Sequence, residues 1–168
     1  MISPYTGLQY GIHLVAEPWG LSPNFTIMPQ YLSELGYRSH IIGKVTLLLF
    51  CILRLSKSGF DSFYGFYNNA EDYYRHEIYL EYKNESFVGL DFWDDTTPVR
   101  DKGGVYATRL YTKRAISLIK DHDKNKPLFL YMPHQAVNGG DSEFGYRTPA
   151  SAMKHFHYIQ DLNRTMLA

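Results

Sequence analysis

Hydrophobic and polar residues follow a clear period in only a few stretches of the chain, and the first of these predicts a helix followed by a strand. Residues 28–36 begin with Pro29 in the first turn and end at Gly36, which predicts a short helix. Thr26 is the expected N-cap. Residues 37–42 supply aromatic and β-branched side chains suited to a strand. A helix, a glycine turn and a strand in this order are typical of an α/β sheet.

The second regular stretch predicts an α/β crossover. Within residues 106–121, apolar side chains recur at helical spacing, namely Ala107, Leu110, Tyr111, Ala115, Leu118 and Ile119. Residues 128–132 form a short apolar run between prolines, as expected of a buried parallel strand. A helix that leads into a buried strand predicts an α/β architecture with a parallel or mixed sheet.

The remaining stretches lack a sustained period, apart from a polar amphipathic tail. We expect extended loop over 1–23, an aromatic loop over 58–76, an irregular acidic and aromatic stretch over 87–100, and a helix over 149–168. The carboxylates of the acidic stretch offer hard oxygen ligands for a divalent cation, although a solvated acidic loop is the favoured interpretation. These carboxylates are Asp91, Asp94 and Asp95.

Candidate chemistry lies where the two predicted strands end. Lys44 follows the first strand, and residues 134–140 follow the second. Ligands of open α/β sheets gather at the carboxyl ends of strands, so both positions are candidates for a site. The simpler interpretation of Lys44 is a solvated loop lysine, because a charged head is rarely buried without a partner.

Composition narrows the function classes. The chain has 17 basic and 17 acidic residues, so no excess of positive charge favours nucleic acid as a partner. Cys51 is the only cysteine, which excludes an intrachain disulfide and a zinc cluster of cysteines. Aromatic residues make up 16% of the chain, which suits carbohydrate or aryl ligands, although core packing is the favoured explanation.

Targeting signals are sparse. Residues 1–5 do not resemble the start of a signal peptide, so the chain as written is expected in the cytoplasm. The apolar run 45–55 is too short to span a bilayer, which takes about 20 residues, and no transmembrane segment is expected. Three Asn-X-Ser/Thr sequons would permit glycosylation in the secretory pathway, at Asn24, Asn84 and Asn163.

Several short segments together resemble the sulfatase family, in particular its arylsulfatase B-like branch. The segments are collinear with the family and span 6–9, 17–21, 32–44, 59–65, 71–76, 106–114, 127–131, 135–137 and 156–167. The resemblance implies an incomplete alkaline-phosphatase-like sulfatase domain, with a central mixed or parallel sheet flanked by helices. Residues 1–168 would form part of the N-terminal catalytic domain.

Members of this family hydrolyse sulfate esters of glycans or aryl alcohols, using a formylglycine made from a cysteine and a calcium ion. By resemblance, the Cys-X-Pro-Ser-Arg motif precedes the segment matching residues 6–9, and the calcium ligands also fall outside residues 1–168. No metal ligand is therefore expected within this chain. The full-length relatives are expected to be lysosomal or secreted.

Three positions of the family's site can be compared directly with this chain. By resemblance, Lys44 contacts the sulfate. Thr46 stands where the family has a histidine that supports the formylglycine hydrate, and Asn138 stands where it has a histidine suited to protonating the leaving group. Neither replacement titrates near neutral pH. Because the formylglycine cysteine and the calcium ligands of the family are also absent from residues 1–168, the chain is expected to be inactive, with a non-catalytic sulfated-glycan-binding or interaction protein as the alternative.

The apolar run 45–55 interrupts the resemblance, because the family has a polar, site-lining turn there. Every valine codon begins with GT, the dinucleotide that opens most introns, so Val45 is compatible with read-through of a splice donor after Lys44. The alternative is a lineage-specific buried strand. Residues 45–55 are treated as an atypical insert on either interpretation.

Overall fold

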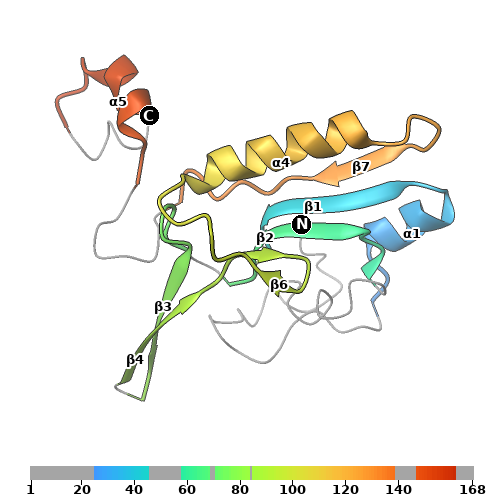
Figure 1. The fold of residues 1–168 in the computed structure, drawn as a ribbon, viewed down its shortest axis with the longest axis horizontal. Helices are drawn as coiled ribbons and strands as arrows, with labels where there is room; N and C mark the ends of the chain where they lie inside the picture. Colours follow the sequence, from blue (N-terminus) through green and yellow to red (C-terminus); the bar gives the residue numbers. More distant parts are fainter. Residues whose placement is uncertain (1–24, 46–57, 69–70, 84, 139–146, 162–168) are drawn as a thin grey trace.

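The computed structural model describes residues 25–45, 58–68, 71–83, 85–138 and 147–161, and its centre is a five-stranded sheet (Figure 1). The elements in chain order are α1 (Met28–Glu34), β1 (Arg38–Lys44), β2 (Ser62–Phe66), β3 (Glu77–Tyr82), β4 (Glu85–Leu90), β5 (Trp93–Asp94), β6 (Thr97–Pro98), α4 (Ala107–Asp121), β7 (Leu128–Tyr131), α5 (Ala150–Met153) and the 3-10 helix η3 (Lys154–Phe156).

The sheet is mixed, and its parallel part contains the predicted strands. Its order is β6-β5-β2-β1-β7, with β1 parallel to both β2 and β7 and with β5 and β6 antiparallel. Lys44 at the end of β1 pairs with Phe66 at the end of β2. Because the three parallel strands run the same way, their carboxyl ends meet at one edge of the sheet. The hairpin of β3 and β4 forms a separate two-stranded sheet.

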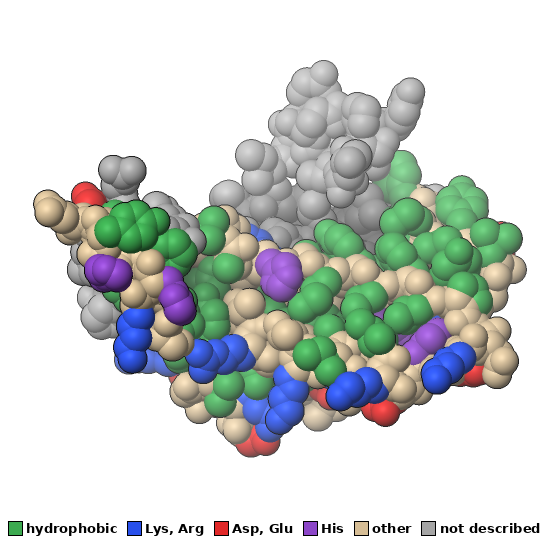
Figure 2. Space-filling model, turned by 90° about the horizontal axis from the view of Figure 1, so that it is seen from above, with side chains coloured by type: hydrophobic (Ala, Val, Ile, Leu, Met, Phe, Trp, Pro, Cys, Tyr) green, Lys and Arg blue, Asp and Glu red, His purple; other side chains and the backbone are tan. Residues whose placement is uncertain are grey.

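Hydrophobic clusters lie on both faces of the sheet. Ile41 and Ile42 are consecutive on β1, so their side chains point to opposite faces, and each belongs to a different cluster. Helix α4 covers the Ile42 side and buries Leu110 and Tyr111 in that cluster (Figure 1). Seen from the side of α4, hydrophobic side chains spread across the face, and Lys and Arg line its lower edge (Figure 2).

The periodic stretches form the elements that the sequence predicts. The helices over 28–36 and 106–121 are confirmed as α1 and α4, and the strand over 37–42 is confirmed as β1. The predicted N-cap is wrong, because Ile27 occupies that position and its amide donates to Gln30 Oε1 at 2.6 Å. The strand over 128–132 is confirmed as β7, but its side chains are half-buried or exposed because it is the edge strand of the described sheet.

The stretches without a period contain strands that the sequence analysis missed. The expected loop over 58–76 includes β2, whose residues read as a continuous aromatic run because both faces of the strand are covered. The expected irregular stretch 87–100 includes most of β4 together with β5 and β6. The helix expected over 149–168 is also wrong within its described part, where only α5 and η3 are helical.

Other predictions fall outside the described residues. These are the loop over 1–23, position 46, most of the apolar run, and the three sequons at Asn24, Asn84 and Asn163. Val45, the first residue of the apolar run, is buried, and its amide donates to the Phe66 carbonyl at 3.1 Å. Within the part of the chain that the structure covers, no helix is long and apolar enough to cross a membrane.

Two glycines allow the backbones to approach closely at the carboxyl edge. Gly43 has φ +124°, and a Cβ there would overlap the carbonyl of Pro133, which follows β7. Gly65 has φ +153°, and a Cβ there would overlap the carbonyl of Gly43. Each position therefore requires glycine for both conformation and space.

We expect Gly43→Ala to lower the free energy of unfolding by more than about 2 kcal/mol, because it adds backbone strain to a steric overlap with the chain after β7. Urea denaturation followed by circular dichroism measures the loss. Gly103→Ala is the matched control, since a Cβ at that exposed position meets nothing within 4 Å. Equal midpoints for the two variants would contradict the close approach.

Candidate functional site

Lys44 lies at the carboxyl edge of the sheet, as the sequence predicts. Its amide donates to the carbonyl of Pro133 at 2.9 Å, so the end of β1 is joined to the segment that follows β7. The Lys44 side chain is half-buried, and this desolvation lowers the pKa of its ammonium group. A partly desolvated cation interacts more strongly with an anion than a fully hydrated one does. The position therefore suits recognition of an anionic group.

The segment after β7 places Asn138 at the same edge. Its amide donates to the Gln135 carbonyl at 3.0 Å, and its own carbonyl accepts a hydrogen bond from the Tyr73 hydroxyl at 2.8 Å. The Asn138 residue is exposed, as is His134. The fold thus brings the two sequence-predicted positions, Lys44 and Asn138, to segments that are hydrogen-bonded to each other near Pro133.

A buried polar network is hydrogen-bonded to the start of this segment. The carboxylate of Glu71 lies 3.0 Å from His76 Nδ1 and accepts a hydrogen bond from the Tyr111 hydroxyl at 3.1 Å. The Gln135 amide nitrogen donates to the backbone carbonyl of Glu71. All four residues are at most 1% exposed. The loop that carries Glu71 therefore fixes the start of the segment that ends in Asn138.

Protonation in this network is set by burial. Desolvation raises the pKa of Glu71 to about 7, against the opposing effect of its hydrogen bonds to His76 and Tyr111. The Lys102 carbonyl accepts a hydrogen bond from His76 Nε2 at 3.2 Å, and Nδ1 of the same ring faces the Glu71 carboxyl group. Below about pH 7 the Glu71 carboxyl group therefore holds a proton.

The sequence alone does not predict this network. Residues 71–76 lie in the stretch expected to be an aromatic loop, and only the family resemblance distinguishes them. Tyr111 and Gln135 lie 40 and 64 residues from Glu71. Neither hydrophobic period nor local spacing carries a signal for such distant partners.

The carboxylates of the acidic stretch are structural. Asp91 is 3% exposed and accepts hydrogen bonds from the Tyr67 and Asn68 amides and from the Trp93 indole. The expectation of a solvated acidic loop is therefore wrong for Asp91, because the backbone turns around its carboxylate. Asp94 pairs with Arg114 at 2.9 Å, and Asp95 accepts from the Phe63 amide at 2.7 Å. These are the carboxylates that were considered for a divalent cation.

The calcium that the family resemblance implies does not fit the described residues. Among residues 25–45, 58–68, 71–83, 85–138 and 147–161, no group of three or more His, Cys, Asp or Glu side chains is arranged to hold a metal ion. The acidic stretch is occupied by the hydrogen bonds and the ion pair described above. We therefore assign no metal ligand to these residues.

Solved structures define the class of the fold. The crystal structure of Ps i-CgsB matches with a TM-score of 0.71 at 19% identity, over 90% of this chain and 34% of that chain. The same protein in complex with k-i-k-neocarrahexaose matches with a TM-score of 0.70 at 18% identity, over the same shares. Together with the mixed sheet and its flanking helices, these similarities define an alkaline-phosphatase-like α/β fold, of which this chain covers a part.

Sequence comparison then gives the family. The family model described as Sulfatase matches residues 2–164, and the chain belongs to the sulfatase family. Arylsulfatase J of Mus musculus is 34% identical over 170 residues, which are 98% of this chain and 26% of that protein. N-acetylglucosamine-6-O-sulfatase of Bacteroides thetaiotaomicron is 33% identical over 109 residues, which are 64% of this chain and 15% of that protein. The chain thus spans about a quarter or less of these curated relatives.

We expect the stability of the protein to fall as pH rises from about 4.5 to 7, because the folded state holds a proton on Glu71 that the unfolded chain releases. Glu71→Gln, which cannot ionise, should remove a loss on the order of 2 to 3 kcal/mol across this window. Urea denaturation at several pH values measures the slope. Glu85→Gln, an exposed carboxylate on β4, is the control and should keep the slope of the parent. Parallel profiles for parent and Glu71→Gln would contradict this assignment.

Proposed function

We propose that the protein to which these residues belong is a sulfuric ester hydrolase of the arylsulfatase B-like branch, with sulfated glycans or aryl sulfates as substrates. The observation that carries the proposal is the half-buried Lys44 at the carboxyl edge of the sheet. Membership of the sulfatase family and the names of the two curated relatives support the same reaction class.

The chemistry of ester hydrolysis indicates what Lys44 would do. Cleavage of the S–O bond releases an alcohol oxygen that must gain a proton, while negative charge stays on the sulfate oxygens. A cation fixed at a strand end stabilises that charge without transferring a proton itself. Lys44 is thus a sulfate-binding residue in this proposal.

Proton transfer is the part of the reaction that this chain lacks. Asn138 stands where the family has a histidine, and an amide donates a hydrogen bond but transfers no proton. Loss of a general acid costs a factor on the order of 10² to 10⁴ in rate.

The formylglycine motif is also missing from residues 1–168. The only cysteine, Cys51, is followed by Ile-Leu-Arg and therefore does not match the Cys-X-Pro-Ser-Arg motif that yields formylglycine. We therefore expect residues 1–168 by themselves to bind sulfate esters without hydrolysing them.

A non-catalytic function in binding sulfated glycans is the second candidate. It is favoured by the combination of a sulfate-binding lysine with Asn138 in place of a titratable side chain. Under this alternative the full-length protein would also lack turnover. Hydrolysis by the full-length protein would favour the enzyme, whereas binding without hydrolysis would favour the second candidate.

We expect the 168-residue chain to bind an aryl sulfate such as 4-nitrocatechol sulfate and to release no more product than a heat-treated blank. Lys44→Ala should weaken binding about tenfold, because it removes the partly desolvated cation. Isothermal titration calorimetry gives the affinity, and absorbance of the released phenol gives the turnover.

Lys120→Ala is the matched control for this loss of charge, since Lys120 is an exposed lysine in the last turn of α4. Equal affinities for the Lys44→Ala and Lys120→Ala variants would contradict the sulfate-binding role. Product release above the blank would contradict the expected inactivity of residues 1–168.

A further inference from the structure

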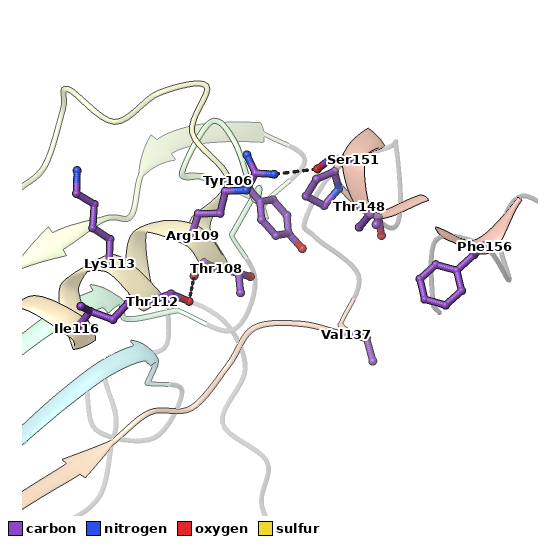
Figure 3. A pocket seen from close by; sticks show the side chains of 12 residues that line it. Tyr106, Thr108, Arg109, Thr112, Lys113, Ile116, Val137, Thr148, Ser151 and Phe156 are labelled. Carbon is purple, nitrogen blue, oxygen red and sulfur yellow. Dashed lines mark hydrogen bonds between the residues drawn. The ribbon is translucent and has the colours of Figure 1, made fainter. Parts of the chain in front are cut away.

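A groove of about 560 Å³ lies between the first half of α4 and the segment that carries α5 and η3 (Figure 3). Arg109 and Thr112 contribute to the α4 wall, Ser151 and Phe156 contribute to the opposite wall, and Val137 also lines the groove. Arg109 Nη2 donates to Ser151 Oγ at 2.9 Å, which joins the two walls at one end.

The α4 wall of the groove is basic, although the chain as a whole has no net charge. Two basic side chains of α4, Arg109 and Lys113, line the groove, and no carboxylate does. The opposite wall contributes uncharged side chains, namely Thr148, Pro149, Ser151, Ala152 and Phe156. The charge distribution is therefore complementary to an anionic occupant.

The remaining lining suits a sugar. Aromatic side chains lie on both sides, with Tyr106 at the start of α4 and Phe156 opposite it. Residues with hydroxyl groups also line the groove, among them Thr112 and Ser151. Aromatic faces pack against the C–H groups of a sugar ring, and hydroxyls pair with those of the sugar. An occupant that combines these groups with negative charge is a sulfated or otherwise acidic glycan.

The groove lies next to the segment that carries Asn138. Val137, which lines the groove, directly precedes Asn138. The Tyr73 hydroxyl donates to the Asn138 carbonyl, and the Tyr73 ring stacks on Tyr106 with centroids 5.2 Å apart. Helix α4 begins directly after Tyr106, which lines the groove, so the positive end of the helix dipole also lies beside the groove.

We infer that this groove binds the acidic sugar units that extend from the sulfate ester at Lys44. The inference rests on the proposed function, because it takes the sulfated glycan as the ligand of the site. Arg109 and Lys113 then bind sulfate or carboxylate groups of neighbouring sugars, and the aromatic walls position the rings. A small aryl sulfate does not extend into the groove.

The test measures the binding of a sulfated chondroitin tetrasaccharide and of 4-nitrocatechol sulfate to the 168-residue chain by isothermal titration calorimetry. We expect a sulfated chondroitin tetrasaccharide to bind about tenfold more weakly to the double variant Arg109→Ala, Lys113→Ala than to the parent. Lys120→Ala, Lys124→Ala removes the same charge from exposed positions outside the groove and should bind like the parent. The affinity should fall as salt rises, and circular dichroism melts verify that each variant is folded.

The outcomes separate this inference from the proposed function. If the groove variant binds the tetrasaccharide as tightly as the control variant does, the groove assignment is overturned whatever happens at Lys44. If Lys44→Ala leaves the affinity for 4-nitrocatechol sulfate unchanged while the groove variant still loses the tetrasaccharide, the proposed function fails and the groove stands as a glycan-binding site.

Discussion

The backbones of β1, β2 and the segment after β7 approach each other at their carboxyl ends so closely that two positions accept only glycine. Gly43 faces the Pro133 carbonyl, and Gly65 faces the Gly43 carbonyl. This contact sets the spacing of the edge at which Lys44 and Asn138 lie. A side chain at either glycine would separate the strands and change the position of the lysine.

A second constraint comes from the buried polar residues behind this edge. A carboxyl group that is fully buried costs free energy unless its oxygens are paired, and Glu71 meets this requirement with His76 and Tyr111. Gln135 connects the same loop to the segment after β7. The network thus orients the backbone that leads to Asn138, and none of its members needs to contact a ligand to have this effect. Its residues are positioning residues.

The sequence predicts the elements that are amphipathic or bounded by clear signals. It does not predict strands in which apolar and polar residues do not alternate. Helix α4 shows helical spacing and β7 is bounded by prolines, so both could be found. β2 is covered on both faces and therefore lacks alternation. In β4, Phe87 and Val88 are both largely exposed, so its pattern does not indicate a buried face. Lys44 was predictable from a strand end, whereas the partners of Glu71 come together only through long-range contacts.

The two titrating groups of the site favour the same range of pH. Glu71 carries its proton below about 7, and protonation spares the fold the cost of a buried charge beneath the segment that ends in Asn138. Lys44 has a lowered pKa, so its cation also persists best towards acidic pH. Under the proposed sulfate-binding role of Lys44, anion binding and the stability of the backbone that leads to Asn138 would therefore both be favoured by lower pH, without any proton transfer to the ligand.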